Sequence, residues 1–144
     1  MSFFYNNAKQ QLASGNLNFA TDDLRVALVM TNTTADTEDD VAFLADFTTL
    51  DEFDGTNYVR KTLAGNALAK DATNNRSEFD ANDVTWTALG AGTRQASGMI
   101  LFLQVTNDSD SPAIAFIDDG GFPFTANGGD VTIQWNAEGI VQFG

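Results

Sequence analysis

Short runs in which apolar and polar residues alternate recur along this chain, and turn-forming residues separate them. The clearest run is Leu24–Met30, where Val26, Leu28 and Met30 share one expected face and further apolar residues fill the other. Apolar residues on both faces are typical of a strand inside a sheet. Further runs lie at residues 58–63, 66–70, 96–106, 113–118, 130–135 and 140–143. With two short strands inside 76–89, they predict roughly eight strands in a mainly β protein, a sandwich or a barrel.

The segment 76–89 has the pattern of a hairpin. Phe79 closes its first short strand, and Val84 and Trp86 share one face of the second because strand side chains alternate with period two. A polar turn lies between them, containing Asp80, Asn82 and Asp83. We therefore expect two strands joined by this turn, with Trp86 anchoring a core.

Two segments in the first half have helical spacing. Tyr5, Ala8 and Leu12 recur at the helical period, and Gly15 follows as a C-terminal cap, which predicts a helical segment at about 3–14. Thr37 precedes a run of acids and an apolar series, which predicts a helix or helical turns over 39–47. The length suits one β-sandwich domain over residues 1–144 with one or two short helices.

Charge narrows the possible partners. Acidic residues outnumber basic ones by 20 to 7, giving a formal net charge of −13 and a pI near 4.1. The bases are scattered, and only Arg60 and Lys61 are adjacent. Phosphate neutralisation needs clustered Lys and Arg, so we expect neither nucleic acid nor an anionic membrane as a partner. The longest apolar run, 99–103, is far shorter than the roughly 20 residues that span a bilayer.

The sequence contains no cysteine and no histidine. Disulfides, thiolate chemistry, the usual zinc ligand and the Ser-His-Asp triad are therefore excluded. Folding in the cytoplasm is compatible with this composition, and the N-terminus lacks the pattern of a signal peptide. The glycines of 90–92 are not followed by the Lys-Thr pair of a phosphate-binding loop. We expect no cofactor and no catalytic residue.

Carboxylates offer the remaining chemistry. Asp80, Asn82 and Asp83 have the oxygen ligands that suit a hard cation, as does the segment 107–110, but turn residues that bond the local backbone explain both more simply. Asp118 and Asp119 are a conceivable acid and base pair of a hydrolase. Neighbouring residues of a continuous strand face opposite sides, which opposes that use. We expect no metal site.

Five aromatic residues are candidate contact residues for another protein. They are Phe3, Phe4 and Tyr5 at the N-terminus and Phe122 and Phe124 on either side of Pro123. Aromatic side chains are enriched in interfaces, although ordinary core packing explains the same residues. Both interpretations stay open at this point.

The order of these segments resembles a family of small virion proteins of tailed bacteriophages, some of which are head decoration, or cement, proteins. The resemblance covers most of the chain and lies in residues 24–29, 58–65, 75–88 and 127–140. The central and C-terminal segments are its most specific parts. Members commonly have glycine or threonine where Glu138 stands, so that position varies. The family offers no catalytic residues to carry over.

The resemblance implies a structural protein with a jelly-roll-like sandwich that binds the major capsid protein on the outside of the head and stabilises contacts between capsomers. Such a protein is made in the bacterial cytoplasm and then becomes part of the virion. Copies that occupy symmetry axes form closed homo-oligomers, so we expect a homotrimer. The alternative is a tail-fibre or tail-tip module that binds a host surface carbohydrate. A hydrolase with paired carboxylates is a third, weaker possibility.

Overall fold

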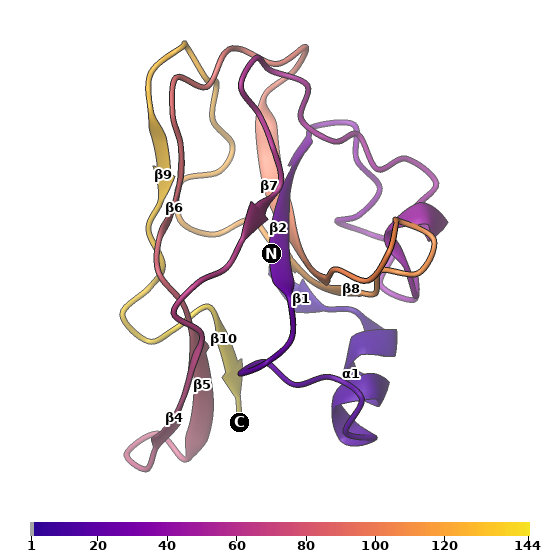
Figure 1. The fold of residues 1–144 in the computed structure, drawn as a ribbon, viewed down its shortest axis with the longest axis vertical. Helices are drawn as coiled ribbons and strands as arrows, with labels where there is room; N and C mark the ends of the chain where they lie inside the picture. Colours follow the sequence, from indigo (N-terminus) through magenta and orange to yellow (C-terminus); the bar gives the residue numbers. More distant parts are fainter. Residues whose placement is uncertain (1) are drawn as a thin grey trace.

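The computed structural model describes residues 2–144, and within them the chain is mainly β, with ten strands, one α-helix and one short 3₁₀ helix. Figure 1 shows the arrangement. In chain order the elements are β1 (Phe3–Phe4), α1 (Asn6–Ala13), β2 (Leu24–Met30), η1 (Leu44–Asp46), β3 (Lys61–Thr62), β4 (Ala67–Asp71), β5 (Arg76–Asp80), β6 (Val84–Trp86), β7 (Ala96–Leu103), β8 (Ala113–Ile117), β9 (Val131–Ile133) and β10 (Val141–Phe143).

The strands form three antiparallel sheets. The largest has the order β1-β8-β7-β2-β3, the second has the order β10-β5-β4, and β6 pairs with β9 in the third. The two smaller sheets lie along one side of the large sheet, on the left of Figure 1. This arrangement is consistent with a β-sandwich.

Strand β2 explains why the large sheet has cores on both faces. Val26, Leu28 and Met30 belong to the main apolar cluster, which lies between the large sheet and the two smaller ones and includes Phe79 and Trp86. The side chains on the opposite face of β2, among them Ala27 and Val29, belong to a second cluster under the loop that follows β2. The prediction of an interior strand with two apolar faces is confirmed.

The N-terminal helix is shorter than the predicted segment 3–14. It begins at Asn6 and ends at Ala13, because Phe3 and Phe4 instead pair with Phe116 and Ala115 of β8. The main-chain bond from the Tyr5 amide to the Ile114 carbonyl, 3.0 Å long, ends the strand pairing. The N-terminus is thus tied into the large sheet before the helix starts.

The predicted helix over 39–47 is wrong except for the single 3₁₀ turn Leu44–Asp46. The Glu38 carboxylate does not support a helix start here. It accepts hydrogen bonds from the Thr34 hydroxyl at 2.7 Å and from the Thr48 amide at 2.9 Å. These bonds close residues 34–48 into a loop, and the loop covers the second apolar cluster with Leu44 and Phe47.

The segment 76–89 forms the two predicted strands, but they do not pair as a hairpin. Strand β5 lies between β4 and β10, and β6 pairs with β9. The cross-strand partners of Phe79 are Leu68 and Val141, and the partner of Trp86 is Val131. The expected core role of Trp86 is confirmed, since its side chain is fully buried, and the side chain of Phe79 is fully buried as well.

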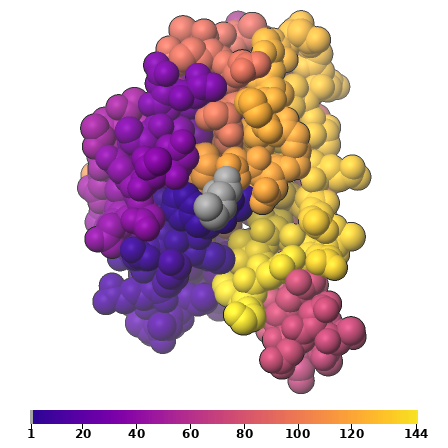
Figure 2. Space-filling model, turned by 180° about the vertical axis from the view of Figure 1, so that it is seen from behind, coloured from indigo at the N-terminus to yellow at the C-terminus, as the bar shows by residue number. Residues whose placement is uncertain are grey.

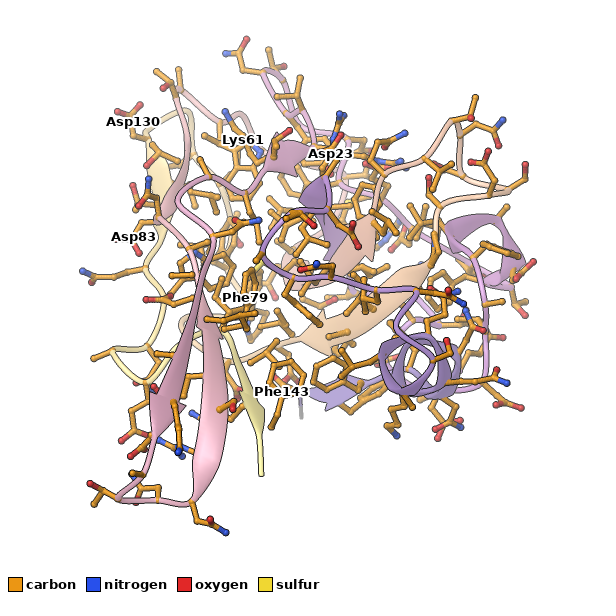
Figure 3. The ribbon with its side chains drawn as sticks, turned by 60° about the horizontal axis from the view of Figure 1, so that its bottom comes forward. Asp23, Lys61, Phe79, Asp83, Asp130 and Phe143 are labelled. Carbon is orange, nitrogen blue, oxygen red and sulfur yellow. The ribbon has the colours of Figure 1, made fainter. Side chains whose placement is uncertain are left out.

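The β4–β5 hairpin projects from the body of the molecule. It is the pink segment at the lower edge of the space-filling view in Figure 2. All residues of β4 except Asp71 are exposed, and β4 has a partner on one edge only. Phe79 and Phe143, labelled in Figure 3, lie where this sheet joins the body. The hairpin is therefore anchored at one end and open to solvent along its length.

Candidate functional site

A groove of about 680 Å³ lies between the edge of the large sheet and the C-terminal part of the chain. Strands β1 and β8 form one wall, and residues 133–142 form the other. The three contributing segments, indigo, orange and yellow, meet on the face shown in Figure 2.

No helix among residues 2–144 is long and apolar enough to cross a bilayer.

Phe3 and Phe4 line this groove and are half-buried. The ring of Phe3 contacts Phe116, with centroids 5.9 Å apart, and the ring of Phe4 contacts Phe143 at 5.7 Å. Their pairing with β8 fixes the backbone of both residues. Two of the five predicted contact residues therefore lie together in a concave surface.

Tyr5 is different from its two neighbours because it is fully buried. Its hydroxyl donates a 2.8 Å hydrogen bond to the Ala35 carbonyl, and its ring packs edge-on against Phe47 at 5.4 Å. Burial, with a smaller effect of nearby Asp36, raises the pKa of this hydroxyl above its ordinary value. For Tyr5 the core-packing interpretation holds.

Phe122 and Phe124 lie outside the groove. Their rings contact each other with centroids 5.5 Å apart, and both are half-buried against the main apolar cluster. Main-chain bonds between Phe124 and Ala96, of 2.9 and 3.0 Å, attach this segment to the start of β7. The five predicted residues therefore do not form one surface: Phe3 and Phe4 line the groove, Tyr5 is buried beneath the ring of Phe3, and Phe122 and Phe124 lie outside the groove.

Trp135 is a groove residue that the sequence analysis did not single out. Its indole Nε1 donates a 3.0 Å hydrogen bond to the Asn82 carbonyl, and its backbone amide donates one of 3.0 Å to Asp83 Oδ1. Two bonds from the turn after β5 thus hold the tryptophan at the groove wall. Of the predicted turn residues, Asp80 bonds the local backbone amide of Ala81 at 2.9 Å, as the simpler interpretation expected, whereas Asp83 bonds the backbone of a tryptophan 52 positions away.

The polar part of the groove is mostly uncharged. Asp119 is the only charged side chain among the described residues that line it, and the neutral polar side chains around it are Ser2, Gln134, Asn136 and Gln142. The Ser2 hydroxyl lies 2.5 Å from Asp119 Oδ2 and 3.3 Å from Asp118 Oδ1. Strand β8 ends at Ile117, so the expectation that these two carboxylates face opposite sides does not apply. Both turn toward the same serine.

The second candidate cation segment, 107–110, is also occupied by protein contacts. Asp110 Oδ1 accepts the backbone amides of Thr106 at 2.9 Å and of Asn107 at 2.8 Å, and these bonds lower the pKa of its carboxyl. Asp108 faces Arg60. Among residues 2–144 there is no group of three or more acidic, histidine or cysteine side chains arranged to hold a metal ion.

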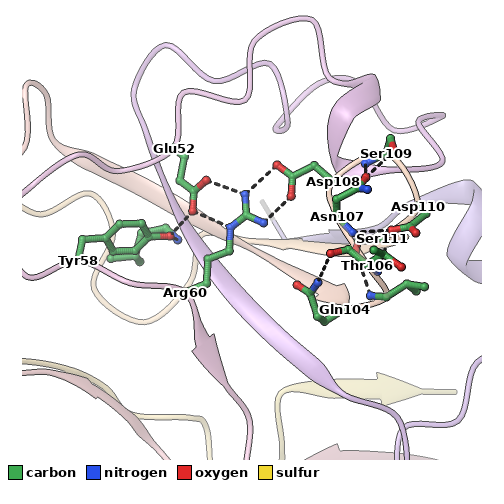
Figure 4. A network of polar contacts seen from close by, with 12 residues as sticks. Glu52, Tyr58, Arg60, Gln104, Thr106, Asn107, Asp108, Ser109, Asp110 and Ser111 are labelled. Atoms are coloured by element: carbon green, nitrogen blue, oxygen red, sulfur yellow. Dashed lines mark hydrogen bonds and ion pairs between the residues drawn. The ribbon is translucent and has the colours of Figure 1, made fainter.

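Arg60 centres a polar network that sequence reasoning missed (Figure 4). Its guanidinium contacts both oxygens of Glu52, at 2.8 and 2.7 Å, and both oxygens of Asp108, at 2.6 and 2.9 Å. The Tyr58 hydroxyl donates to Glu52 at 2.8 Å, and Arg60 Cζ lies 5.3 Å from the ring centroid of Phe102. Hydrogen bonds from Arg60 hold the pKa of Asp108 below its usual value. The network joins two loops that are far apart in the sequence.

Comparison of the chain with protein-family models, with curated proteins and with solved structures finds no match in any of the three.

Proposed function

We propose that this chain is a structural protein of a tailed-bacteriophage virion, a head decoration or cement protein with a jelly-roll-like β-sandwich. The carrying observation is that the two segments with the most specific resemblance, 75–88 and 127–140, lie side by side. Strand β6 pairs with β9 in register, Val84 opposite Ile133 and Trp86 opposite Val131. One structural unit thus contains the residues that support the proposal.

The bonding of the polar residues supports a rigid role. Residues that are candidates for chemistry are used to hold loops: Asp83 holds Trp135, Asp110 holds the 106–110 turn, and Arg60 joins Glu52 and Asp108. Such fixed loops lose little conformational entropy when they bind another surface. A protein that reinforces an assembled shell benefits from this preorganisation.

We place the contact with the major capsid protein at the groove. Its wall combines the aromatic side chains of Phe3, Phe4 and Trp135 with neutral amides. Aromatic residues at the centre and polar residues at the rim are the composition of protein interfaces. In the proposal the protein binds as a homotrimer on the outside of the head, after synthesis in the bacterial cytoplasm.

Binding to heads that lack the protein tests this placement. Gln134 is exposed and lines the groove, so Gln134→Trp fills it, whereas exposed Thr132 on the same strand segment lies outside the groove and gives the matched control Thr132→Trp. We expect co-sedimentation of the wild type and of Thr132→Trp with purified heads, and loss of binding for Gln134→Trp. Equal binding by both variants contradicts the groove as the contact, and no binding by any of them contradicts the proposed function.

Carbohydrate binding by a tail-fibre or tail-tip module is the second candidate. One observation favours it: Trp135 lies in the same groove as Gln134, Asn136 and Asp119. A glycan array probed with the wild type distinguishes the two functions. Glycan binding that Gln134→Trp abolishes, together with localisation in the tail, favours the alternative.

A further inference from the structure

Positive charge is concentrated in one part of this acidic chain. Between Asp54 and Asp71 the sequence has no acid and holds three of the seven bases, Arg60, Lys61 and Lys70. Two other long acid-free stretches, 1–21 and 84–107, each hold a single base. Segment 55–70 is therefore the most basic part of a molecule whose net charge is −13.

The arginines of the molecule are neutralised internally, but the lysines of this segment are not. Four arginines make ion pairs: Arg25 with Asp23; Arg60 with Glu52 and Asp108; Arg76 with Asp71, Glu78 and Glu138; and Arg94 with Asp51. Across residues 2–144, Lys61 and Lys70 take part in no ion pair. Lys61 is labelled in Figure 3.

The same segment also has exposed apolar side chains and open strand edges. Val59 is 57% exposed and Leu68 is 52% exposed, and these are two of the three large apolar side chains exposed in the described part of the chain. Strands β3 and β4 are edge strands of their sheets. Open edges beside exposed apolar residues are the surfaces that pair with other chains. Val59, Lys61, Leu68 and Lys70 are called the basic strip below.

A second copy of the chain offers a complementary surface. The loop 36–46 carries Asp36, Glu38, Asp39, Asp40 and Asp46 and no base. Asp36, Asp39 and Asp40 are exposed. The loop contacts the start of α1, since the Asn6 amide bonds the Asp39 carbonyl at 2.9 Å. In Figure 1, α1 lies at the right and the β4–β5 hairpin at the lower left. The β4 end of the basic strip, with Leu68 and Lys70, is therefore on a different side of the molecule from the acidic loop, and Lys61 of β3 lies beside β2.

We infer that the basic strip is a self-association surface and that it docks against the acidic loop of a second copy. Two copies with a charge of −13 repel each other over most of their surfaces, so a stable contact needs one surface that is not acidic. Strip and loop are two different surfaces, so the contact is head-to-tail. Such a contact forms a closed ring when the rotation between neighbouring copies closes, as the proposed homotrimer requires. The inference deepens the proposed homo-oligomer and rests on that part of the proposed function.

Charge reversal in sedimentation velocity tests the inference. The wild type should associate as its concentration rises from about 1 µM to about 1 mM, the range of weak protein contacts. Lys61→Glu or Lys70→Glu should raise the dissociation constant of self-association by about tenfold or more, because each places an acid opposite the acidic loop. A tenfold rise corresponds to about 1.4 kcal/mol. The double variant Thr87→Glu and Gln95→Glu makes the same change in net charge at two exposed residues outside the basic strip and the acidic loop, and it should leave association close to wild type. Leu68→Ser tests the apolar part, with circular dichroism to check its fold.

Mixing two variants tests the head-to-tail geometry. A double variant with Lys61→Glu and Lys70→Glu, and another with Asp39→Lys and Asp40→Lys, should each associate weakly alone and strongly when mixed. The acidic strip of the first then meets the basic loop of the second. A wild type that stays monomeric up to about 1 mM, equal weakening by the control variant Thr87→Glu and Gln95→Glu, or a mixture that does not associate overturns the inference. Head binding by a monomeric wild type overturns only this inference, whereas association without head binding overturns only the proposed function.

Discussion

Replacing Arg60 by methionine tests whether the network in Figure 4 holds the loops of this fold together. Methionine keeps most of the aliphatic stem, so the substitution removes the charge and its hydrogen bonds more than the packing. The change leaves Glu52, whose side chain is 26% exposed, with the hydroxyl of Tyr58 as a side-chain donor. Asp108, at 40% exposure, loses its ion pair but stays closer to water.

The magnitude follows from these exposures. Hydrogen bonds to a partly buried charge contribute about 1.5–3 kcal/mol, which applies to the Glu52 pair. The Asp108 pair is screened by solvent and contributes about 0.2–1 kcal/mol. The contact of the guanidinium with the Phe102 ring adds about 0.5–1 kcal/mol. We expect Arg60→Met to lower the free energy of unfolding by about 3 kcal/mol, near the lower end of values for breaking a buried pair.

Urea denaturation followed by tryptophan fluorescence and circular dichroism measures this loss. Arg25→Met is the matched control, because its ion pair with Asp23 is more exposed, at 35% and 43% of the two side chains. That control should lose less than about 1 kcal/mol. A loss for Arg60→Met below about 1 kcal/mol, or one equal to that of Arg25→Met, refutes a stabilising role for the network.

Three other changes probe the core, a turn and the acid response. Trp86→Ala should lower the free energy of unfolding by about 3–5 kcal/mol, because it leaves a cavity at a fully buried site. A loss below about 1 kcal/mol in chemical denaturation would contradict this. Gly139→Ala places a Cβ 2.6 Å from the Phe79 carbonyl oxygen, whereas the control Gly128→Ala has the same left-handed backbone and no neighbour within 4 Å of the new Cβ. Calorimetry should show the larger fall in Tm for Gly139→Ala. Equal falls in Tm would exclude the clash. Arg60 lowers the pKa of Asp108 from its ordinary value of 3.8 in the folded state, so the stability due to this carboxylate is present above about pH 4 and lost as pH falls through the lowered pKa. Asp108→Asn should therefore lose less stability on acidification than the wild type. Parallel curves of unfolding free energy against pH would contradict this.

Local patterns in the sequence predicted the parts of the fold that local interactions decide. Leu24–Met30 forms a strand with the predicted bounds because its alternation places apolar side chains in both clusters. The predicted hairpin over 76–89 failed for the opposite reason. The partners of β5 and β6 include β10 and β9, which lie far along the chain, and alternation alone carries no information about which strands pair.

The predicted helix over 39–47 failed because tertiary contacts outweighed a capping pattern. A threonine followed by acids begins many helices, but Glu38 here bonds Thr34 and Thr48 and closes a loop. Whether Glu38 can close this loop depends on where Thr48 lies in space, and the spacing of acids along the chain does not reveal that position.

The candidate site was predictable only in part. An aromatic cluster at the N-terminus is visible in the sequence, yet the pairing of β1 with β8 at the edge of the large sheet places Phe3 and Phe4 at the groove, whereas Tyr5, just before the helix, is buried against Phe47. Trp135 follows the alternation of Val131 and Ile133, which was the available signal. Its position at the groove wall depends on bonds to Asn82 and Asp83, and those are non-local.

The central claim is a structural role on the outside of a phage head, and imaging of intact particles tests it most directly. Cryo-electron microscopy of virions assembled with the wild-type chain should show density on the head surface that fits this fold. The groove of Phe3, Phe4 and Trp135 should face the major capsid protein, with three copies around threefold or quasi-threefold positions. Particles without this density, or with the chain confined to the tail, would contradict the account.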